Sequence, residues 1–185
     1  MSVFRSFEQA VERAEAARRT WVAANCALEE AKAPIQSFGE QSASALSSVL
    51  TRFAEAGLLP EIDPHFHTRD YLCPYTNYIA ADRIEMRGLN ARAGGDARMD
   101  TKGLRVAEEI VAAANTHKIP IVHEMNGGQN IQVSPHVKER ENAPEILLRA
   151  LAAYAEGRHK PEMAGVARAA AEEMKTAVAA YREIG

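Results

Sequence analysis

Two repeats of regularly spaced residues, one near each end of the chain, constrain the fold more than any other feature of the sequence. The first runs through four heptads at alternating spacings of three and four: Phe4, Phe7, Val11, Ala14, Arg18, Trp21, Asn25 and Leu28. This spacing is typical of a helix that packs one face against another helix. Arg18 and Asn25 interrupt it at equivalent core positions. In a coiled coil such residues fix register and strand number, whereas in a short hairpin Arg18 would extend to solvent.

The first 57 residues are predicted to form an antiparallel helical hairpin. Ser2 is suited to cap a helix that runs to about Lys32. Pro34 is predicted to end this helix, because proline disfavours helical geometry in the residue before it. A second helix follows over residues 35–56, with Gly57 at its C-terminal cap.

The last part of the chain, residues 138–185, is predicted to form a pair of helices that packs on residues 1–57. Asn142 is expected to cap the first helix, and Pro161 to open the second. The second helix carries a repeat of small and apolar residues: Met163, Ala167, Ala170, Met174, Ala177, Tyr181 and Ile184. This narrow face either packs within the chain or forms a subunit interface.

Residues 58–137 are predicted to form a small α/β module. Three prolines between residues 58 and 75 indicate a long ordered loop up to Asp82. A strand is expected over residues 83–89 and a helix around residues 104–114, capped by Asp100 or Thr101. A β-hairpin is expected near residues 119–134, where a three-residue loop separates polar from apolar side chains. Its predicted register pairs Ile121 with Val133 and His123 with Ile131. The chain is therefore expected to be a helix-rich α+β protein, with long terminal helices packed together around this module.

His65-Phe66-His67 is the sharpest local motif, because alternate residues of a strand share one face and two imidazoles can hold a metal. Asp63 to Asp70 resembles the metal-binding strand of the amidohydrolases, particularly the dihydroorotase type. In that family the strand opens a barrel of about 250 residues, and only 118 residues follow His67 here. The resemblance is therefore confined to the motif. It suggests a zinc site formed by His65, His67 and a third ligand such as His123, His136, Asp70 or Cys73, and a small metal-dependent hydrolase as an alternative function. Alternatively, the same histidines form hydrogen bonds to loop backbone.

A basic, tyrosine-rich stretch over residues 65–105 is the second candidate site. Arginine forks suit phosphate and carboxylate groups, and tyrosine rings can stack on a base. The residues predicted to bind a small anionic, nucleotide-like ligand or a partner are Tyr71, Tyr75, Tyr78, Arg83, Arg87, Arg92 and Arg98. Alternatively, the arginines are solvated residues that protect a sheet edge from aggregation.

Composition and motifs exclude several functional classes. The net charge of −3 argues against general nucleic-acid binding, and no apolar run approaches the length of a membrane span. Two cysteines are too few for a disulfide framework, which favours a cytoplasmic location. No nucleophile elbow, phosphate-binding loop or dinucleotide fingerprint is present. We therefore expect a non-enzymatic binding or assembly protein without a cofactor, most simply a homo-oligomer.

Overall fold

The computed structural model describes residues 2–69, 80–92, 94–125 and 128–184, apart from the side chains of residues 2–6, 66–69, 80, 92, 97 and 184. Five helices and four strands lie within these ranges. In chain order the helices and strands are α1 (Ser2–Glu55), β1 (Ile62–Arg69), β2 (Ala80–Gly88), α2 (Leu89–Arg92), α3 (Thr101–Thr116), β3 (Ile121–Met125), β4 (Gln129–Val133), α4 (Ala143–Gly157) and α5 (Pro161–Ile184). The predicted class, helix-rich α+β with long terminal helices packed together, is confirmed.

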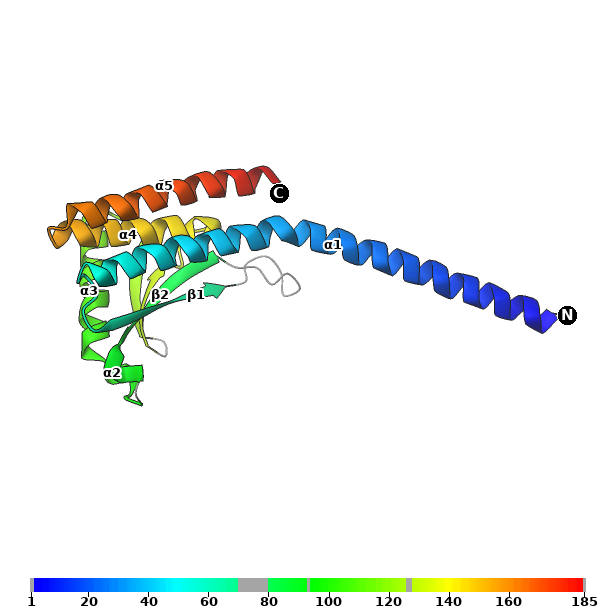
Figure 1. The fold of residues 1–185 in the computed structure, drawn as a ribbon, viewed down its shortest axis with the longest axis horizontal. Coiled ribbons are helices and arrows are strands. Elements are labelled where there is room, and N and C mark those ends of the chain that lie inside the picture. The colour runs from blue at the N-terminus through cyan, green and yellow to red at the C-terminus, as the bar shows by residue number, and fades with distance from the viewer. Residues whose placement is uncertain (1, 70–79, 93, 126–127, 185) are drawn as a thin grey trace.

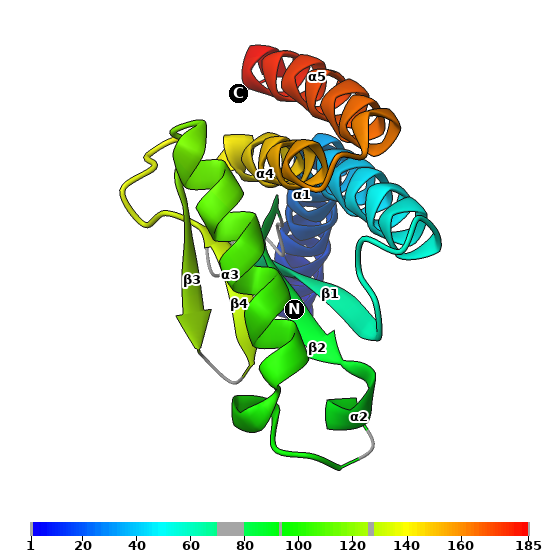
Figure 2. The same ribbon diagram turned by 90° about the vertical axis from the view of Figure 1, so that its left-hand side faces the viewer.

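The four strands form one antiparallel sheet in the order β1-β2-β4-β3. Helices α3, α4 and the C-terminal part of α1 cover one face of this sheet, and α5 lies outside α1 and α4 as a further layer (Figures 1 and 2). The covered face of the sheet carries the apolar side chains, among them Ile84, Met86 and Ile131, which are fully buried. The core therefore lies between the sheet and the helices.

The predicted hairpin over residues 1–57 is wrong, because α1 is a single helix that continues through Pro34. Proline removes one backbone hydrogen bond and crowds the carbonyl one turn earlier, at a cost of about 3 kcal/mol. Pro34 lies half-exposed and Glu30, whose carbonyl loses its partner, is exposed, so water can satisfy that carbonyl. Long helical segments on both sides then outweigh the local preference. The N-terminal part of α1 projects away from the rest of the molecule (Figure 1).

The loop predicted from Leu58 to Asp82 is also corrected, because it contains strand β1 and the beginning of β2. Pro64 lies inside β1, paired with Met86 of β2. Strand β1 is at the edge of the sheet, where one side of the backbone needs no partner and proline is tolerated. The prolines that had predicted a loop therefore belong in part to an edge strand.

The other predicted helices and strands are confirmed, although Asn142 precedes α4 without the expected side-chain capping hydrogen bond. Ile84, Met86 and Gly88 share the buried side of β2, as the alternation indicates. Asp100 caps α3, since its carboxylate accepts hydrogen bonds from the backbone N–H groups of Lys102 and Gly103 at 3.1 and 3.0 Å. The hairpin has the predicted register, in which Ile121 pairs with Val133 and His123 with Ile131.

The C-terminal repeat packs inside the chain, so of its two predicted alternatives the structure has the intramolecular one. Ala167 and Met174 are buried where α5 contacts α1 and α4. Tyr181 stacks on Phe38 of α1. Among the residues that the structure describes, none of the helices combines the length and the apolar character that crossing a membrane requires.

Candidate functional site

The sheet face that the helices leave uncovered is polar. Strand alternation and register place on it Asp63 and His65 of β1, the row Arg83, Glu85 and Arg87 of β2, and Asn130 and Gln132 of β4. His65 lies opposite Glu85, and Glu85 lies opposite Asn130. Three strands thus bring together acids, bases and amides that are separated by up to about 70 residues in the chain.

Glu85 is the centre of this polar face, which we call the polar cluster. Its side chain is 3% exposed, and its carboxylate Oε1 lies 2.8 Å from Nε of Arg87. The pKa of Arg87 is raised, first by its hydrogen bond to Glu85 and then by the negative charges of Glu85 and Asp63, against the opposing effect of burial. Gly128 approaches the Glu85 carboxylate so closely that a Cβ atom there would overlap it.

The remaining charges of the polar cluster are also paired. Asp63 Oδ2 lies 3.6 Å from His65 Nε2, and Asp82 Oδ1 lies 4.0 Å from Arg83 Nε. Arg83 and Arg87, both predicted ligand-binding residues, share one face of β2 as the strand alternation requires. Each is balanced by a carboxylate close in sequence, so an anionic ligand would compete with Asp82 and Glu85 for them.

The other predicted anion-binding residues either lie away from Arg83 and Arg87 or are outside the described residues. Arg98 is exposed on a short 3-10 turn between α2 and α3. The side chain of Arg92 and the whole of Tyr71, Tyr75 and Tyr78 lie outside the described residues. The anion site thus stays a prediction.

The structure separates two of the three predicted metal ligands, His65 and His123. His65 is on edge strand β1, whereas His123 is on β3 at the opposite edge of the sheet. His123 also faces the side of Ile131, where its Nε2 lies 3.0 Å from Oε1 of Gln129. The side chain of His67 is outside the described residues. Within the described part of the chain no group of three His, Cys, Asp or Glu side chains is placed to hold a metal ion.

The projecting segment of α1, residues 7–31, is a long surface exposed to solvent. Every residue in it is exposed. The exposed fraction of the side chain is 68% for Phe7 and 65% for Trp21, and the other large apolar residues here, Val11, Val22 and Leu28, are exposed as well. An exposed apolar row of this length marks an interaction surface.

The heptad positions of the exposed repeat continue into the buried half of the same helix. Counting on by four and three from Leu28 reaches Lys32, Ile35, Gly39, Ser42, Leu46, Val49 and Phe53. From Gly39 onward all of these are buried, in the part of α1 that contacts α5, the sheet and α4. One face of α1 is therefore covered by the chain's own core at one end and uncovered at the other. Because the N-terminal repeat had been expected to pack in a hairpin, its exposure is a finding of the structure.

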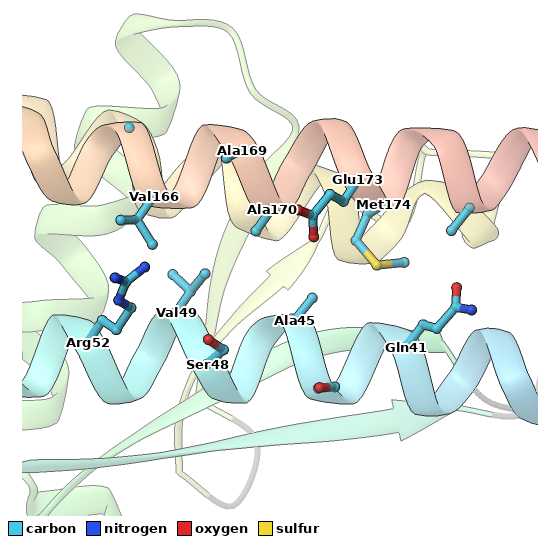
Figure 3. A pocket seen from close by; sticks show the side chains of 13 residues that line it. Gln41, Ala45, Ser48, Val49, Arg52, Val166, Ala169, Ala170, Glu173 and Met174 are labelled. Atoms are coloured by element: carbon cyan, nitrogen blue, oxygen red, sulfur yellow. The ribbon is translucent and has the colours of Figure 1, made fainter.

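A groove of about 710 Å³ separates α1 from α5 along their outer sides (Figure 3). Most of its lining is small or apolar, including Ala45, Val49 and Ala170, and its only ionisable side chains are Arg52 and Glu173. Figure 3 shows these side chains from both helices bordering the space between them. Ser44 and Ser48 also line the groove, and no histidine or cysteine is among its lining residues.

Three residues of the polar cluster were not among the predicted site residues: Asp63, Glu85 and Asn130. Asp63 fell in the segment predicted as loop, and the pairing of β1 with β2 and β4 joins residues far apart in sequence. The available signal was the alternation Arg83-Ile84-Glu85-Met86-Arg87, which already put Glu85 on the side of both arginines.

Comparison with known proteins adds no assignment. No protein-family model, no curated protein and no solved structure matches this chain.

Proposed function

We propose that this protein is a non-enzymatic assembly protein that forms homo-oligomers through the projecting segment of α1. The observation that carries the proposal is the full exposure of residues 7–31 together with their heptad repeat. A single helix in water gains little from burial and is held only by its own backbone hydrogen bonds. Pairing with another helix removes the apolar row from water, and this stabilises the pair by about 25 cal/mol per Å² of apolar surface buried.

The helix is built for this use along its whole length. Its repeat keeps the same heptad positions as the buried half of α1, where the face does pack. The residues around the apolar row are good helix formers, with alanine at positions 10, 16, 17, 23, 24, 27 and 31. Ion pairs such as Glu29 with Lys32, at 3.1 Å, support the helix. The scarcity of cysteine supports a cytoplasmic location.

The mass of the protein in solution tests the proposal. Light scattering coupled to size exclusion should give a multiple of the 20.2 kDa chain mass. Trp21→Glu places a charge in the apolar row and should shift the protein toward monomer. Ala23→Glu, two residues away on the opposite side of the helix, is the matched control and should leave the mass unchanged. A wild-type monomer at all concentrations would contradict the proposal.

Both variants are expected to fold, because residues 7–31 make no part of the buried core. The thermal transition of the domain formed by residues 35–184 should therefore stay close to that of wild type in each. This separates loss of assembly from loss of structure.

We also propose that the stretch from residue 65 to 105 takes a small anionic ligand such as a nucleotide. What supports this is the common face of Arg83 and Arg87 beside the buried Glu85. Binding of such a ligand to the folded state would raise the melting temperature, which a nucleotide screen measures directly.

A further inference from the structure

We propose that two copies of this chain pair through their projecting segments as an antiparallel two-stranded coiled coil, with Arg18 of each copy beside Glu15 of the partner subunit. This inference rests on the proposed assembly function and adds the partner's direction and register. It follows from the residues that occupy and flank the repeat on an otherwise uncovered helix.

The repeat is symmetric about Ala16, so it is complementary to its own reverse. When two copies are placed antiparallel about Ala16, every repeat residue of one copy lies at the same height along the helix axis as a repeat residue of the other. The pairs are Phe4 with Leu28, Phe7 with Asn25, Val11 with Trp21, and Ala14 with Arg18. Three of the four levels pair a larger side chain with a smaller one. Alternation of large and small residues is what lets facing layers interdigitate.

The residues that flank the repeat on the side of Arg18 also suit the partner subunit in charge and polarity. In an antiparallel pair this flank of one helix adjoins the same flank of the other. The flanking positions hold Glu8, Glu15, Val22 and Glu29. In the register above, Arg18 adjoins Glu15 of the partner subunit and Asn25 adjoins Glu8 of the partner subunit. The two Glu15 residues also adjoin each other, so the two arginines and two glutamates form one neutral group of four charges. The apolar Val11 adjoins Val22 of the partner subunit, which accounts for the one apolar residue among the acidic ones.

The opposite flank consists of alanine. Ala10, Ala17, Ala24 and Ala31 recur every seven residues on the side of Phe7 and Trp21. In the antiparallel arrangement these positions adjoin one another across the pair. Their small side chains let the two helices approach and leave room for the rings of Phe7 and Trp21.

A parallel pair loses these matches. Arg18 would face Arg18 of the partner subunit, and each flanking glutamate would adjoin an alanine. Two cations would then share one core layer, each with only the Glu15 of its own chain beside it and no acid from the partner subunit. Like charges in a desolvated interface are strongly unfavourable, so the charge pattern selects the antiparallel direction.

The domain selects the register. Sliding the partner by one heptad toward the domain would bring Phe4 level with Ile35, which already packs against its own core. Sliding it one heptad the other way would place Val11 beside Glu15 of the partner subunit. The symmetric register covers the uncovered repeat and stops before the covered one.

A distance across the dimer tests this arrangement with a residue the chain already has. Cys26 is exposed on the projecting segment and can carry a spin label, with Cys73→Ser to prevent a second label. In the antiparallel pair the two Cys26 sites lie 20 residues apart along the axis, or about 30 Å at 1.5 Å per residue. In a parallel pair they lie at the same level. Electron–electron distance measurement distinguishes these outcomes.

Crosslinking gives an independent readout in a Cys26→Ser, Cys73→Ser background. Ala17→Cys should be joined to its partner by a short thiol crosslinker only in the antiparallel pair, and Asn25→Cys only in a parallel one. Dimeric mass, a distance near 30 Å and crosslinking of Ala17→Cys are the expected results. A dimer with a short Cys26 distance and crosslinked Asn25→Cys overturns the inference but leaves the assembly function standing, and so does a mass above dimer. A monomer overturns both.

Discussion

The rings of Phe38 and Tyr181 stack with their centroids 5.2 Å apart and their planes 21° from parallel. They join α1, at the point where it becomes buried, to the last turns of α5. Aromatic pairs of this kind contribute about 0.5–1.5 kcal/mol beyond the area they bury. We expect a coupling energy of that size in a double-mutant cycle with Phe38→Leu and Tyr181→Leu, measured by denaturant unfolding. Additive single effects would show that the stack contributes only burial.

Stability should decline at alkaline pH because of Tyr154. Burial, and secondarily the charge of Glu109, raises the pKa of this phenol, whose hydroxyl donates a 2.8 Å hydrogen bond to the Leu58 carbonyl. The folded state therefore favours the neutral phenol. This stabilisation is complete below the ordinary tyrosine pKa of about 10 and is lost as the pH rises from there through the raised pKa of the folded state.

The variant Tyr154→Phe should flatten that decline and lower the unfolding free energy by about 1 kcal/mol at neutral pH, through the lost hydrogen bond. Unfolding free energies measured from about pH 8 to about pH 11 check both effects. Burial also raises the pKa of Tyr181, so Tyr181→Phe is the matched control and should flatten the decline only in part. An unchanged slope in Tyr154→Phe would contradict the assignment.

Two glycine substitutions should have opposite signs. A Cβ at Gly128 would overlap the buried Glu85 carboxylate, and we expect Gly128→Ala to destabilise the domain by about 1–3 kcal/mol. A Cβ at Gly165 of α5 meets no atom within 4 Å. Gly165→Ala should therefore stabilise by about 0.5–1 kcal/mol, the usual gain inside a helix. Paired thermal unfolding curves measure the contrast, and equal shifts in one direction would refute the packing described for Glu85.

The anion proposal makes a prediction of sign at the same carboxylate. If a nucleotide binds at Arg87, Arg87→Ala should weaken it by about 1.5–3 kcal/mol, the scale of a charge-assisted hydrogen bond. Glu85→Gln should instead strengthen binding, because it removes the acid that competes for the guanidinium. Both effects should shrink at high salt. Thermal shifts with a nucleotide series provide the measurement. Failure of every nucleotide to raise the melting temperature of wild type would end the proposal.

Where the determining signal was local, the sequence was sufficient to predict the structure. Asp100 caps α3 through bonds to residues two and three positions away, and the hairpin register followed from one turn and the alternation of its two strands. The row Ile84, Met86 and Gly88 was recognisable for the same reason. Each of these depends on contacts within a few residues of the chain.

The errors arose where tertiary context outweighed a local rule. Pro34 and Pro64 both disfavour the elements that contain them, yet one lies half-exposed inside a very long helix and the other in an edge strand. The polar cluster around Glu85 could not be assembled from sequence, because its members reach one another only through the pairing of β1, β2 and β4. Exposure of the N-terminal repeat was hidden by the same mistaken hairpin.

The unbroken course of α1 has a mechanical consequence. One rigid helix joins the uncovered row to the core, so the row points in a direction that the core sets, and each residue added between them turns it by about 100°. An insertion of one residue near Pro34 would rotate the exposed row about the helix axis, away from its original direction. An insertion of seven residues would restore that direction and lengthen the projecting segment by about 10 Å. The helix thus fixes the rotational angle between the domain and a partner bound at the exposed row.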